Sequence, residues 1–291
     1  MVKREFNTES NDNVLFVTSQ CNNRCVMCCQ PPVADNLDVR YEECLRQLRT
    51  APRELKVIGI TGGEPTLLGE RLVSLLADVH RCLPDTAIHL LSNGRAFADL
   101  NYTKRLKEAA GDKLFVGVPL HSDYEGDHDL IAGCHGAYKE TMYGLYNLAE
   151  AGIDIELRVV IGRFNYQRLP QMAEFIYKNI PFVGWVALMG MELTGYAVTK
   201  QEEVWVEPID YKGLLAEAVD ILDNWGIDVS VYNIPLCLLE ERTQPFAVKS
   251  ISDWKVKYLP ECNGCLIKEN CCGHFATSRR PFKGILSVGG K

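Results

Sequence analysis

The chain has 291 residues, of which 47% are hydrophobic and 24% charged, and its formal net charge at pH 7 is −7. This composition is typical of a soluble globular protein with a sizeable core, and the acidic balance argues against a nucleic-acid-binding surface. Residues 1–13 lack the apolar core of a signal peptide, and no apolar run is long enough to span a bilayer. The twelve cysteines are therefore expected to be reduced thiols or metal ligands in a cytoplasmic protein.

Short β-branched runs alternate with longer amphipathic stretches in the first two thirds of the chain. The expected strands are 13–18, 56–61, 87–92, 114–120, 154–161 and 182–189. Between them lie helical patterns such as 70–80, in which Leu72, Leu76 and Val79 recur at helical spacing. Such alternation predicts βαβ units and a parallel sheet, which right-handed crossovers wind in one direction. We therefore predict an α/β fold, a partial (β/α)6 TIM-like barrel without the two further repeats of a full eight-unit barrel.

The composition changes near residue 200. One more helical pattern at 211–226 and one strand pattern at 227–234 follow, and the chain then becomes loop-like and rich in cysteine. We expect a core of residues 1–200 that carries a small, cysteine-rich C-terminal subdomain of residues 201–291.

Four cysteines crowd into "CNNRCVMCC", directly after the first expected strand. Cys21, Cys25 and Cys28 form C-x3-C-x2-C at the carboxyl end of that strand, where parallel α/β barrels place their active sites. Three thiolates can hold three irons of a [4Fe–4S] cluster and leave the fourth iron open. A zinc ion held by the loop alone, the alternative, would need a fourth ligand. Cys29 is a poor fourth ligand because adjacent side chains rarely bind one metal, so we interpret it as non-ligating.

The segment "ITGGEPT" follows the second expected strand. Gly62 and Gly63 permit the backbone to approach a ligand closely, and Glu64 offers an acceptor for an ammonium group. Pro65 fixes the turn into the next helix. We interpret this segment as part of a ligand-binding rim.

Further polar residues are expected at the same rim. Ser92 and Asn93 end the third expected strand, although an Asn-Gly turn alone would also explain them. Strand alternation places Arg158 in the barrel interior, where its partner would be a ligand carboxylate or Glu156. His121 ends the fourth expected strand and is interpreted as a hydrogen-bonded or cavity-lining residue.

A second group of cysteines lies near the C-terminus. Cys262, Cys265 and Cys271 are spaced C-x2-C-x5-C, Cys272 follows directly, and Cys237 stands upstream. Four thiolates from separate turns form a closed site for zinc or for an iron–sulfur cluster, and the spacing alone does not choose between them.

The cysteine loop together with the GGEP segment resembles the radical S-adenosylmethionine (SAM) superfamily. The resemblance implies that Cys21, Cys25 and Cys28 bind a [4Fe–4S] cluster and that its open iron chelates the amino and carboxylate groups of SAM. Met27 stands where the family usually has an aromatic residue and would pack against the adenine. The other implied SAM contacts are Gly62, Gly63, Glu64, Pro65, Ser92, Asn93 and Arg158. A reductant such as flavodoxin or ferredoxin would supply an electron, and the resulting 5′-deoxyadenosyl radical would abstract hydrogen from the substrate.

Beside such a core, the C-terminal cysteines resemble the twitch subdomain, which implies one auxiliary [4Fe–4S] cluster on Cys237, Cys262, Cys265 and Cys271. The segment "CCGHF" departs from the family pattern and leaves Cys272 open as the alternative to Cys271, although the x5 spacing favours Cys271.

Segments outside the cysteine loops, among them "GGEPTLLGE", "VALMGMELTGYA" and "VWVEPIDY", resemble the His-Xaa-Ser system radical SAM maturases. This implies a peptide or small-protein substrate with His-Xaa-Ser repeats and a second radical SAM protein as partner. The alternatives are a radical SAM enzyme acting on a small molecule and a zinc-binding protein without catalysis.

Overall fold

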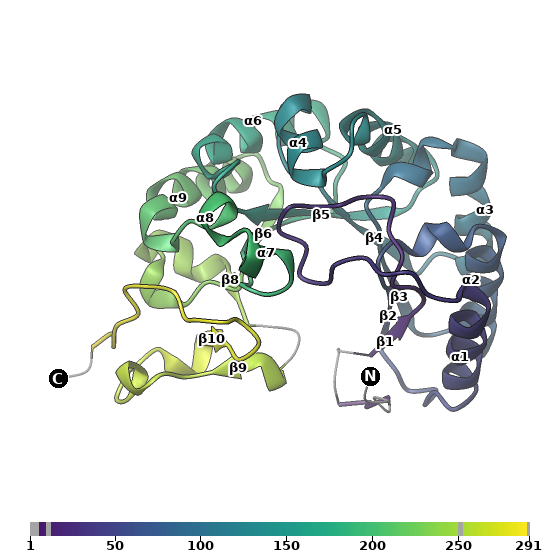
Figure 1. Cartoon of the computed structure of the whole chain (residues 1–291), viewed down its shortest axis with the longest axis horizontal. Coiled ribbons are helices and arrows are strands. Elements are labelled where there is room, and N and C mark those ends of the chain that lie inside the picture. Colours follow the sequence, from purple (N-terminus) through teal and green to yellow (C-terminus); the bar gives the residue numbers. More distant parts are fainter. Residues whose placement is uncertain (1–5, 10–12, 250–252, 290–291) are drawn as a thin grey trace. The chain divides into compact units, whose positions relative to one another are not determined.

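The computed structural model describes residues 6–9, 13–249 and 253–289 (Figure 1). The chain forms two compact units. The first comprises Met1–Arg24, Pro31–Pro119 and Gly136–Glu156, and the second comprises Cys25–Gln30, Leu120–His135 and Leu157–Lys291.

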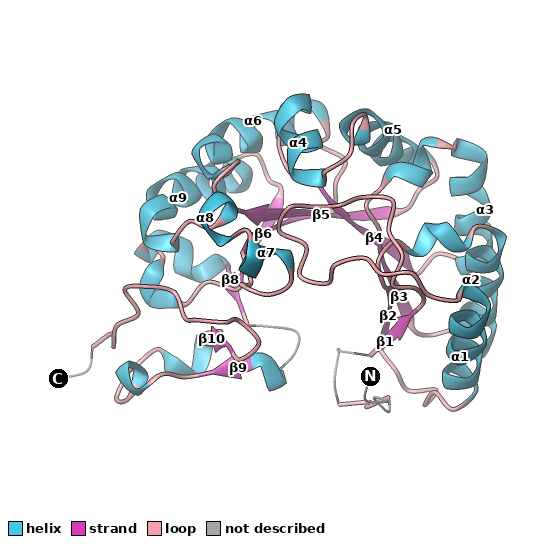
Figure 2. Cartoon of the chain, in the orientation of Figure 1, coloured by secondary structure: helices cyan, strands magenta, loops and turns pink. Residues whose placement is uncertain are grey.

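Among the described residues, eight strands belong to one sheet, in which each strand is hydrogen-bonded to the next one in the chain. The strands are drawn in magenta in Figure 2. Parallel registers join β1 to β2, β2 to β3, β3 to β4, β6 to β7 and β7 to β8. This confirms the expected α/β fold class with a mostly parallel sheet. The strands are β1 (Val14–Phe16), β2 (Val57–Thr61), β3 (Ala87–Leu91), β4 (Leu114–Pro119), β5 (Asp154–Ile161), β6 (Trp185–Gly190), β7 (Asp228–Tyr232) and β8 (Ala247–Val248).

The sheet extends two strands beyond the six expected ones. β7 coincides with the strand pattern seen at 227–234, but it pairs parallel to β6 and so continues the main sheet. β8 has two residues and follows the 3₁₀ segment η5 (Glu241–Phe246), so it leaves no hydrophobic pattern that sequence reasoning could detect. A further pair, β9 (Val256–Lys257) and β10 (His274–Phe275), is antiparallel.

The helices of the first unit are α1 (Leu37–Arg49), α2 (Glu70–Cys82), α3 (Leu100–Ala110) and α5 (Ala137–Glu150). Helices α1 to α3 lie along one face of strands β1 to β3 (Figure 2). In α2 the residues at helical spacing, Leu72, Leu75, Leu76 and Val79, are fully buried. Asn36 and Asp99 cap α1 and α3 by accepting backbone N–H bonds with their side chains.

The second unit contains α4 (Glu125–Ala132), α6 (Leu169–Asn179), α7 (Tyr196–Thr199), α8 (Gln201–Val204) and α9 (Pro208–Asn224). A hydrophobic cluster in this unit includes Met27, Met191, Leu193 and Trp205. Within the described residues, no helix combines the length and apolar character needed to cross a membrane.

Candidate functional site

In the first unit, the segment that follows β2 is pinned to the segment that follows β1. The Gly63 N–H donates to the Thr18 carbonyl and the Glu64 N–H donates to the Gln20 carbonyl, each at 2.7 Å. A Cβ on Gly63 would lie 2.0 Å from the Gln20 carbonyl oxygen, and a Cβ on Gly62 would lie 2.3 Å from that of Thr18. The two glycines therefore permit contact between two backbone segments, a role that the sequence reasoning did not foresee.

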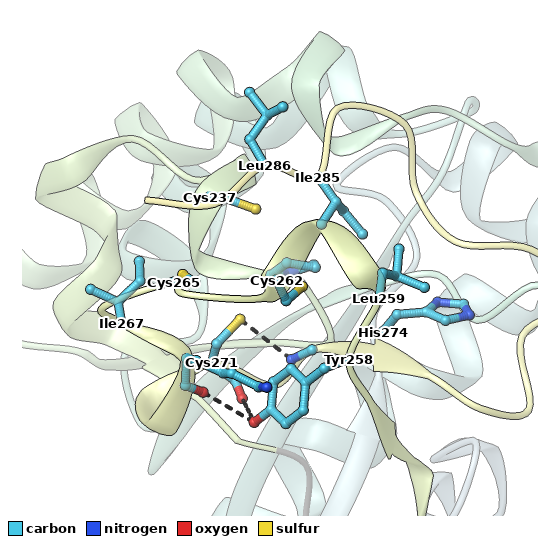
Figure 3. A pocket seen from close by; sticks show the side chains of 13 residues that line it. Cys237, Tyr258, Leu259, Cys262, Cys265, Ile267, Cys271, His274, Ile285 and Leu286 are labelled. Carbon is cyan, nitrogen blue, oxygen red and sulfur yellow. Dashed lines mark hydrogen bonds between the residues drawn. The ribbon is translucent and has the colours of Figure 1, made fainter. Parts of the chain in front are cut away.

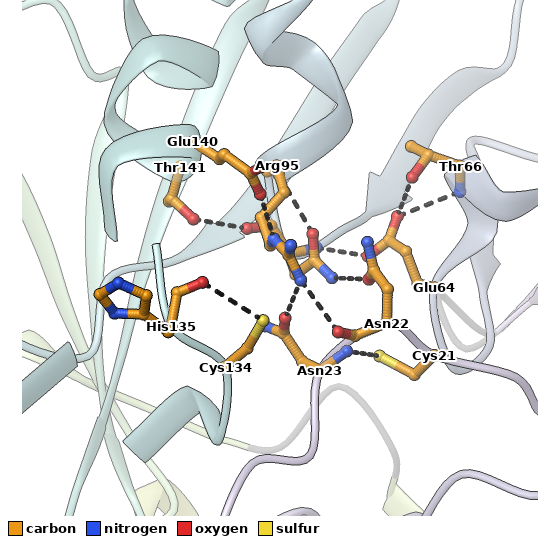
Figure 4. Close-up of polar contacts among 12 residues, drawn as sticks. Cys21, Asn22, Asn23, Glu64, Thr66, Arg95, Cys134, His135, Glu140 and Thr141 are labelled. Carbon is orange, nitrogen blue, oxygen red and sulfur yellow. Dashed lines mark hydrogen bonds and ion pairs between the residues drawn. The ribbon is translucent and has the colours of Figure 1, made fainter. Parts of the chain in front are cut away.

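Glu64 ties the end of β2 to the end of β3. Its side chain is fully buried, and Oε1 accepts hydrogen bonds from the Thr66 N–H, the Thr66 hydroxyl and the Ser92 hydroxyl at 2.7–3.0 Å (Figure 4). Oε2 accepts from the Asn93 N–H at 2.7 Å. Burial raises the pKa of Glu64, while these hydrogen bonds act in the opposite direction. The Glu64 carboxylate thus fixes the position of Ser92 and Asn93. A ligand ammonium group that binds Glu64 would have to share the carboxylate oxygens with these protein donors.

Arg95 organises the segment beside Cys21, and the sequence reasoning missed it. Its Nη1 donates to the Asn22 carbonyl at 2.9 Å and to Asn23 Oδ1 at 2.7 Å, and its Nε pairs with Glu140 (Figure 4). The Asn93 side chain donates to Asn22 Oδ1 at 2.7 Å. An arginine directly after the Asn-Gly turn was the only signal available in the sequence.

Cys21 is held as a hydrogen-bond acceptor. Its Sγ accepts the Asn23 N–H at 3.3 Å (Figure 4). Burial raises the pKa of the Cys21 thiol, whereas this hydrogen bond and the Arg95 charge lower it. The Cys21 sulfur is thus oriented by a backbone N–H donor two residues away.

In the second unit, the segment Cys25–Gln30 is anchored to residues 195–196. The Tyr196 N–H donates to the Cys28 carbonyl at 2.9 Å, and Gly195, at φ +57°, allows this approach because a Cβ there would lie 2.4 Å from the same oxygen. Cys25 Sγ lies 3.9 Å from Nε2 of His121. Cys29 is exposed.

Met27 lines a small apolar hollow in the second unit. The hollow measures about 200 Å³ with its open mouth included. Its walls also include Val26, Ile131, Val160, Phe164 and Met191. Most of the wall of this hollow is therefore apolar.

The structure gives Glu156 a partner that sequence reasoning missed. Its Oε2 lies 2.7 Å from Nε2 of His89 on β3, and the His89 ring stacks on Phe115 at 4.3 Å between centroids. Arg158, predicted as a ligand contact, directs Nη2 toward the Met189 sulfur at 3.5 Å.

The four predicted cysteines of the C-terminal region converge on one hollow of the second unit. Cys237, Cys262, Cys265 and Cys271 line a space of about 370 Å³, its open mouth included (Figure 3). The apolar part of its wall includes Leu259, Ile267, Ile285 and Leu286. Cys237 and Cys271, which are 34 positions apart in the chain, thus line the same hollow.

The two adjacent cysteines of this region have different environments. Cys271 Sγ accepts the N–H groups of Leu236 and Gly273, each at 3.4 Å. A hydrogen bond from Cys272, together with these N–H groups, lowers the pKa of Cys271 to about 6 against the effect of burial. Cys272 is buried, its Sγ lies 3.4 Å from the Gly273 carbonyl oxygen, and its pKa is raised well above the usual value by the hydrogen bond to Cys271 and by burial. Cys271 therefore has the environment of a metal ligand.

Cys265 also accepts a backbone hydrogen bond, because the Val288 N–H donates to its Sγ at 3.5 Å. Within the described residues, no three Cys, His, Asp or Glu side chains are arranged to hold a single metal ion.

Comparisons with known proteins show which superfamily the chain belongs to. Residues 15–176 match the sequence model of the radical SAM superfamily. The Fe-coproporphyrin III synthase of Methanosarcina barkeri is 27% identical over 175 residues, which are 55% of this chain and 39% of that protein. The GTP 3′,8-cyclase of Nautilia profundicola is 38% identical over 99 residues, 32% of this chain and 30% of that protein. The chain therefore spans less than two fifths of either relative.

Among solved structures, anSMEcpe with bound AdoMet and the Cp18Cys peptide has a similar fold. The TM-score is 0.58 at 18% identity, over 75% of this chain and 62% of that one. At this identity the similarity concerns the fold.

Proposed function

The chain belongs to the radical SAM superfamily, and from this membership and the contacts of the cysteine loop we propose that Cys21, Cys25 and Cys28 hold a [4Fe–4S] cluster whose open iron binds SAM. When bound, the cluster would supply one electron for reductive cleavage of SAM to methionine and a 5′-deoxyadenosyl radical, and this radical would abstract hydrogen from the substrate. A flavodoxin- or ferredoxin-like protein is the proposed electron source.

One observation carries this proposal most directly. The backbone bonds from Gly63 and Glu64 to Thr18 and Gln20 fasten the GGEP segment to the residues that immediately precede Cys21. In the first unit, the GGEP segment is therefore packed against the residues that lead into Cys21, the first cysteine of the C-x3-C-x2-C loop.

The residues around this element have distinct proposed roles. Glu64 positions Ser92 and Asn93, whose remaining polar groups are proposed to bind the ribose or the methionine carboxylate. The peptide groups of Gly62 and Gly63, with Pro65 fixing the turn, shape the rim for the methionine end. Hydrogen bonds within the protein hold Ser92 and Asn93 to Glu64, which would lower the entropic cost of orienting SAM.

In the second unit, Met27 and its apolar hollow are proposed to receive the adenine, and Arg158 is proposed to bind a carboxylate of SAM. The apolar walls also exclude water from the position where a radical would form, which protects it from side reactions.

We further propose that residues 201–291 form a twitch-like subdomain with an auxiliary [4Fe–4S] cluster on Cys237, Cys262, Cys265 and Cys271. The shared hollow and the N–H bonds to Cys265 and Cys271 support this assignment. Iron and acid-labile sulfide would be measured after anaerobic reconstitution. Zinc without sulfide would favour the non-catalytic alternative.

The proposed substrate is a peptide or small protein with His-Xaa-Ser repeats, modified together with a second radical SAM protein. The resemblance of segments such as "VALMGMELTGYA" to the maturase family supports it, and a protein of similar fold binds a peptide. The names of the two relatives favour the second candidate, a small-molecule substrate.

Co-expression of the chain with a His-Xaa-Ser repeat peptide and the second radical SAM protein, followed by mass spectrometry, separates the two candidates. We expect a SAM-dependent mass change of the peptide that is absent with Cys25→Ala. An unmodified peptide would favour the small-molecule candidate.

A further inference from the structure

A buried histidine faces one of the proposed cluster ligands. His121 follows β4 and is only 4% exposed to solvent. Its Nε2 lies 3.9 Å from Cys25 Sγ, a distance at which a long hydrogen bond to sulfur can form. Both residues belong to the second unit. The contact is therefore internal to one compact body.

The backbone of His121 is fixed from two sides. Its N–H donates to Nδ1 of His128 on α4 at 3.2 Å, and its carbonyl accepts the Asn165 side-chain amide at 2.9 Å. The Leu120 N–H donates to the Arg158 carbonyl at 3.0 Å, which continues strand pairing up to the histidine. The backbone that carries the imidazole is thus held by hydrogen bonds other than the contact with Cys25, and the ring itself packs beside the His128 ring at 5.0 Å between centroids.

The ring nitrogens of His121 differ in their surroundings. Nδ1 is buried and has no hydrogen-bond partner in the part of the chain that the structure describes, whereas Nε2 faces Cys25. A neutral imidazole carries one N–H, on either Nδ1 or Nε2. Because no acceptor lies beside Nδ1, no hydrogen bond there favours the tautomer with the hydrogen on Nδ1. An iron-bound thiolate carries no hydrogen, so a hydrogen bond between the two groups must run from Nε2–H to sulfur.

We propose that His121 donates a hydrogen bond to the Cys25 thiolate and thereby raises the reduction potential of the cluster that this loop holds. The inference rests on the proposed function, because it requires a cluster on Cys25. Reduction adds negative charge that spreads onto the ligand sulfurs, so an N–H donor stabilises the reduced state more than the oxidised one. His121 is a positioning residue that acts through the ligand.

The test uses the full-length, anaerobically reconstituted protein and a redox titration followed by EPR. The core cluster is identified as the signal whose shape changes when SAM is added. His121→Met and His121→Gln have similar length, but only glutamine keeps an N–H donor near the position of Nε2. We expect the methionine variant to lower the equilibrium constant for one-electron reduction of the core cluster about tenfold, which is a fall of 59 mV in its reduction potential. The glutamine variant should keep a potential close to that of the wild type.

His128→Asn is the matched control, because the asparagine oxygen can still accept the His121 N–H. This variant should leave the potential unchanged. Equal potentials in the methionine variant, the glutamine variant and the wild type, with the SAM-sensitive signal intact, would overturn the inference and leave the proposed function standing. A wild-type protein without any SAM-sensitive signal would instead contradict the proposed function itself and the inference with it.

Discussion

Replacing Gly63 by alanine tests whether the GGEP segment holds the cysteine loop in place. The added methyl group would lie 2.0 Å from the Gln20 carbonyl oxygen, and the nearby atoms are backbone, which cannot rotate away as a side chain can. Relief requires the two segments to separate, which breaks the backbone bonds Gly63 to Thr18 and Glu64 to Gln20.

The expected cost follows from these contacts. Two buried backbone hydrogen bonds are worth about 1 kcal/mol each, and the steric displacement adds about 1–3 kcal/mol. We therefore expect Gly63→Ala to lower the free energy of unfolding by about 3–5 kcal/mol. Because the displaced segment leads directly into Cys21, the iron content after reconstitution should also fall.

The assay is urea unfolding followed by circular dichroism, together with iron analysis of the same preparation. Gly213→Ala is the control, because this glycine lies within α9 and an added Cβ would meet an ordinary contact at 3.6 Å. That variant should be neutral or slightly more stable, since alanine favours helix. A Gly63→Ala protein with wild-type stability and iron content would show that the GGEP segment does not hold the cysteine loop in place.

Three further outcomes are expected. Cys271→Ser should remove the auxiliary cluster's iron, whereas Cys272→Ser should retain it, as measured by iron analysis in a Cys25→Ala background. Burial lowers the pKa of His128 to about 4, so the unfolded state takes up a proton first as the pH falls and stability is lost between about pH 6.5 and 4. His128→Asn should therefore reduce the loss of unfolding free energy between pH 7 and 5 by about 2 kcal/mol in urea titrations. Glu64→Gln should lower the free energy of unfolding by about 1–3 kcal/mol in the same assay, because the NH2 group of glutamine would face a hydrogen-bond donor. An unchanged unfolding midpoint would contradict the hydrogen bonds described for Glu64.

The sequence was informative where chemistry depends on local spacing. β-branched runs located the strands, and helical periodicity located the buried face of α2, because both signals repeat over a few residues. The spacing of Cys262, Cys265 and Cys271 and the upstream Cys237 predicted a shared site, and these residues do line one hollow.

Contacts between distant segments could not be predicted in the same way. Gly62 and Gly63 were interpreted as making room for a ligand, although each also makes room for a backbone segment more than 40 residues away in the chain. His121 carried no signal of its position beside Cys25, because the contact joins residues 96 positions apart. Strand β8 has only two residues, which are too few to show the alternation of apolar and polar side chains that identifies a strand.

SAM cleavage by the wild-type protein, Cys25→Ala and Cys29→Ala shows directly whether the loop that contains Cys25 holds a catalytic cluster. Each would be reconstituted anaerobically, reduced with dithionite and assayed for 5′-deoxyadenosine. We expect 5′-deoxyadenosine from the wild type and from Cys29→Ala, and none from Cys25→Ala. Wild-type activity in Cys25→Ala, or no activity in a wild-type protein that carries its full iron and sulfide, would contradict this expectation.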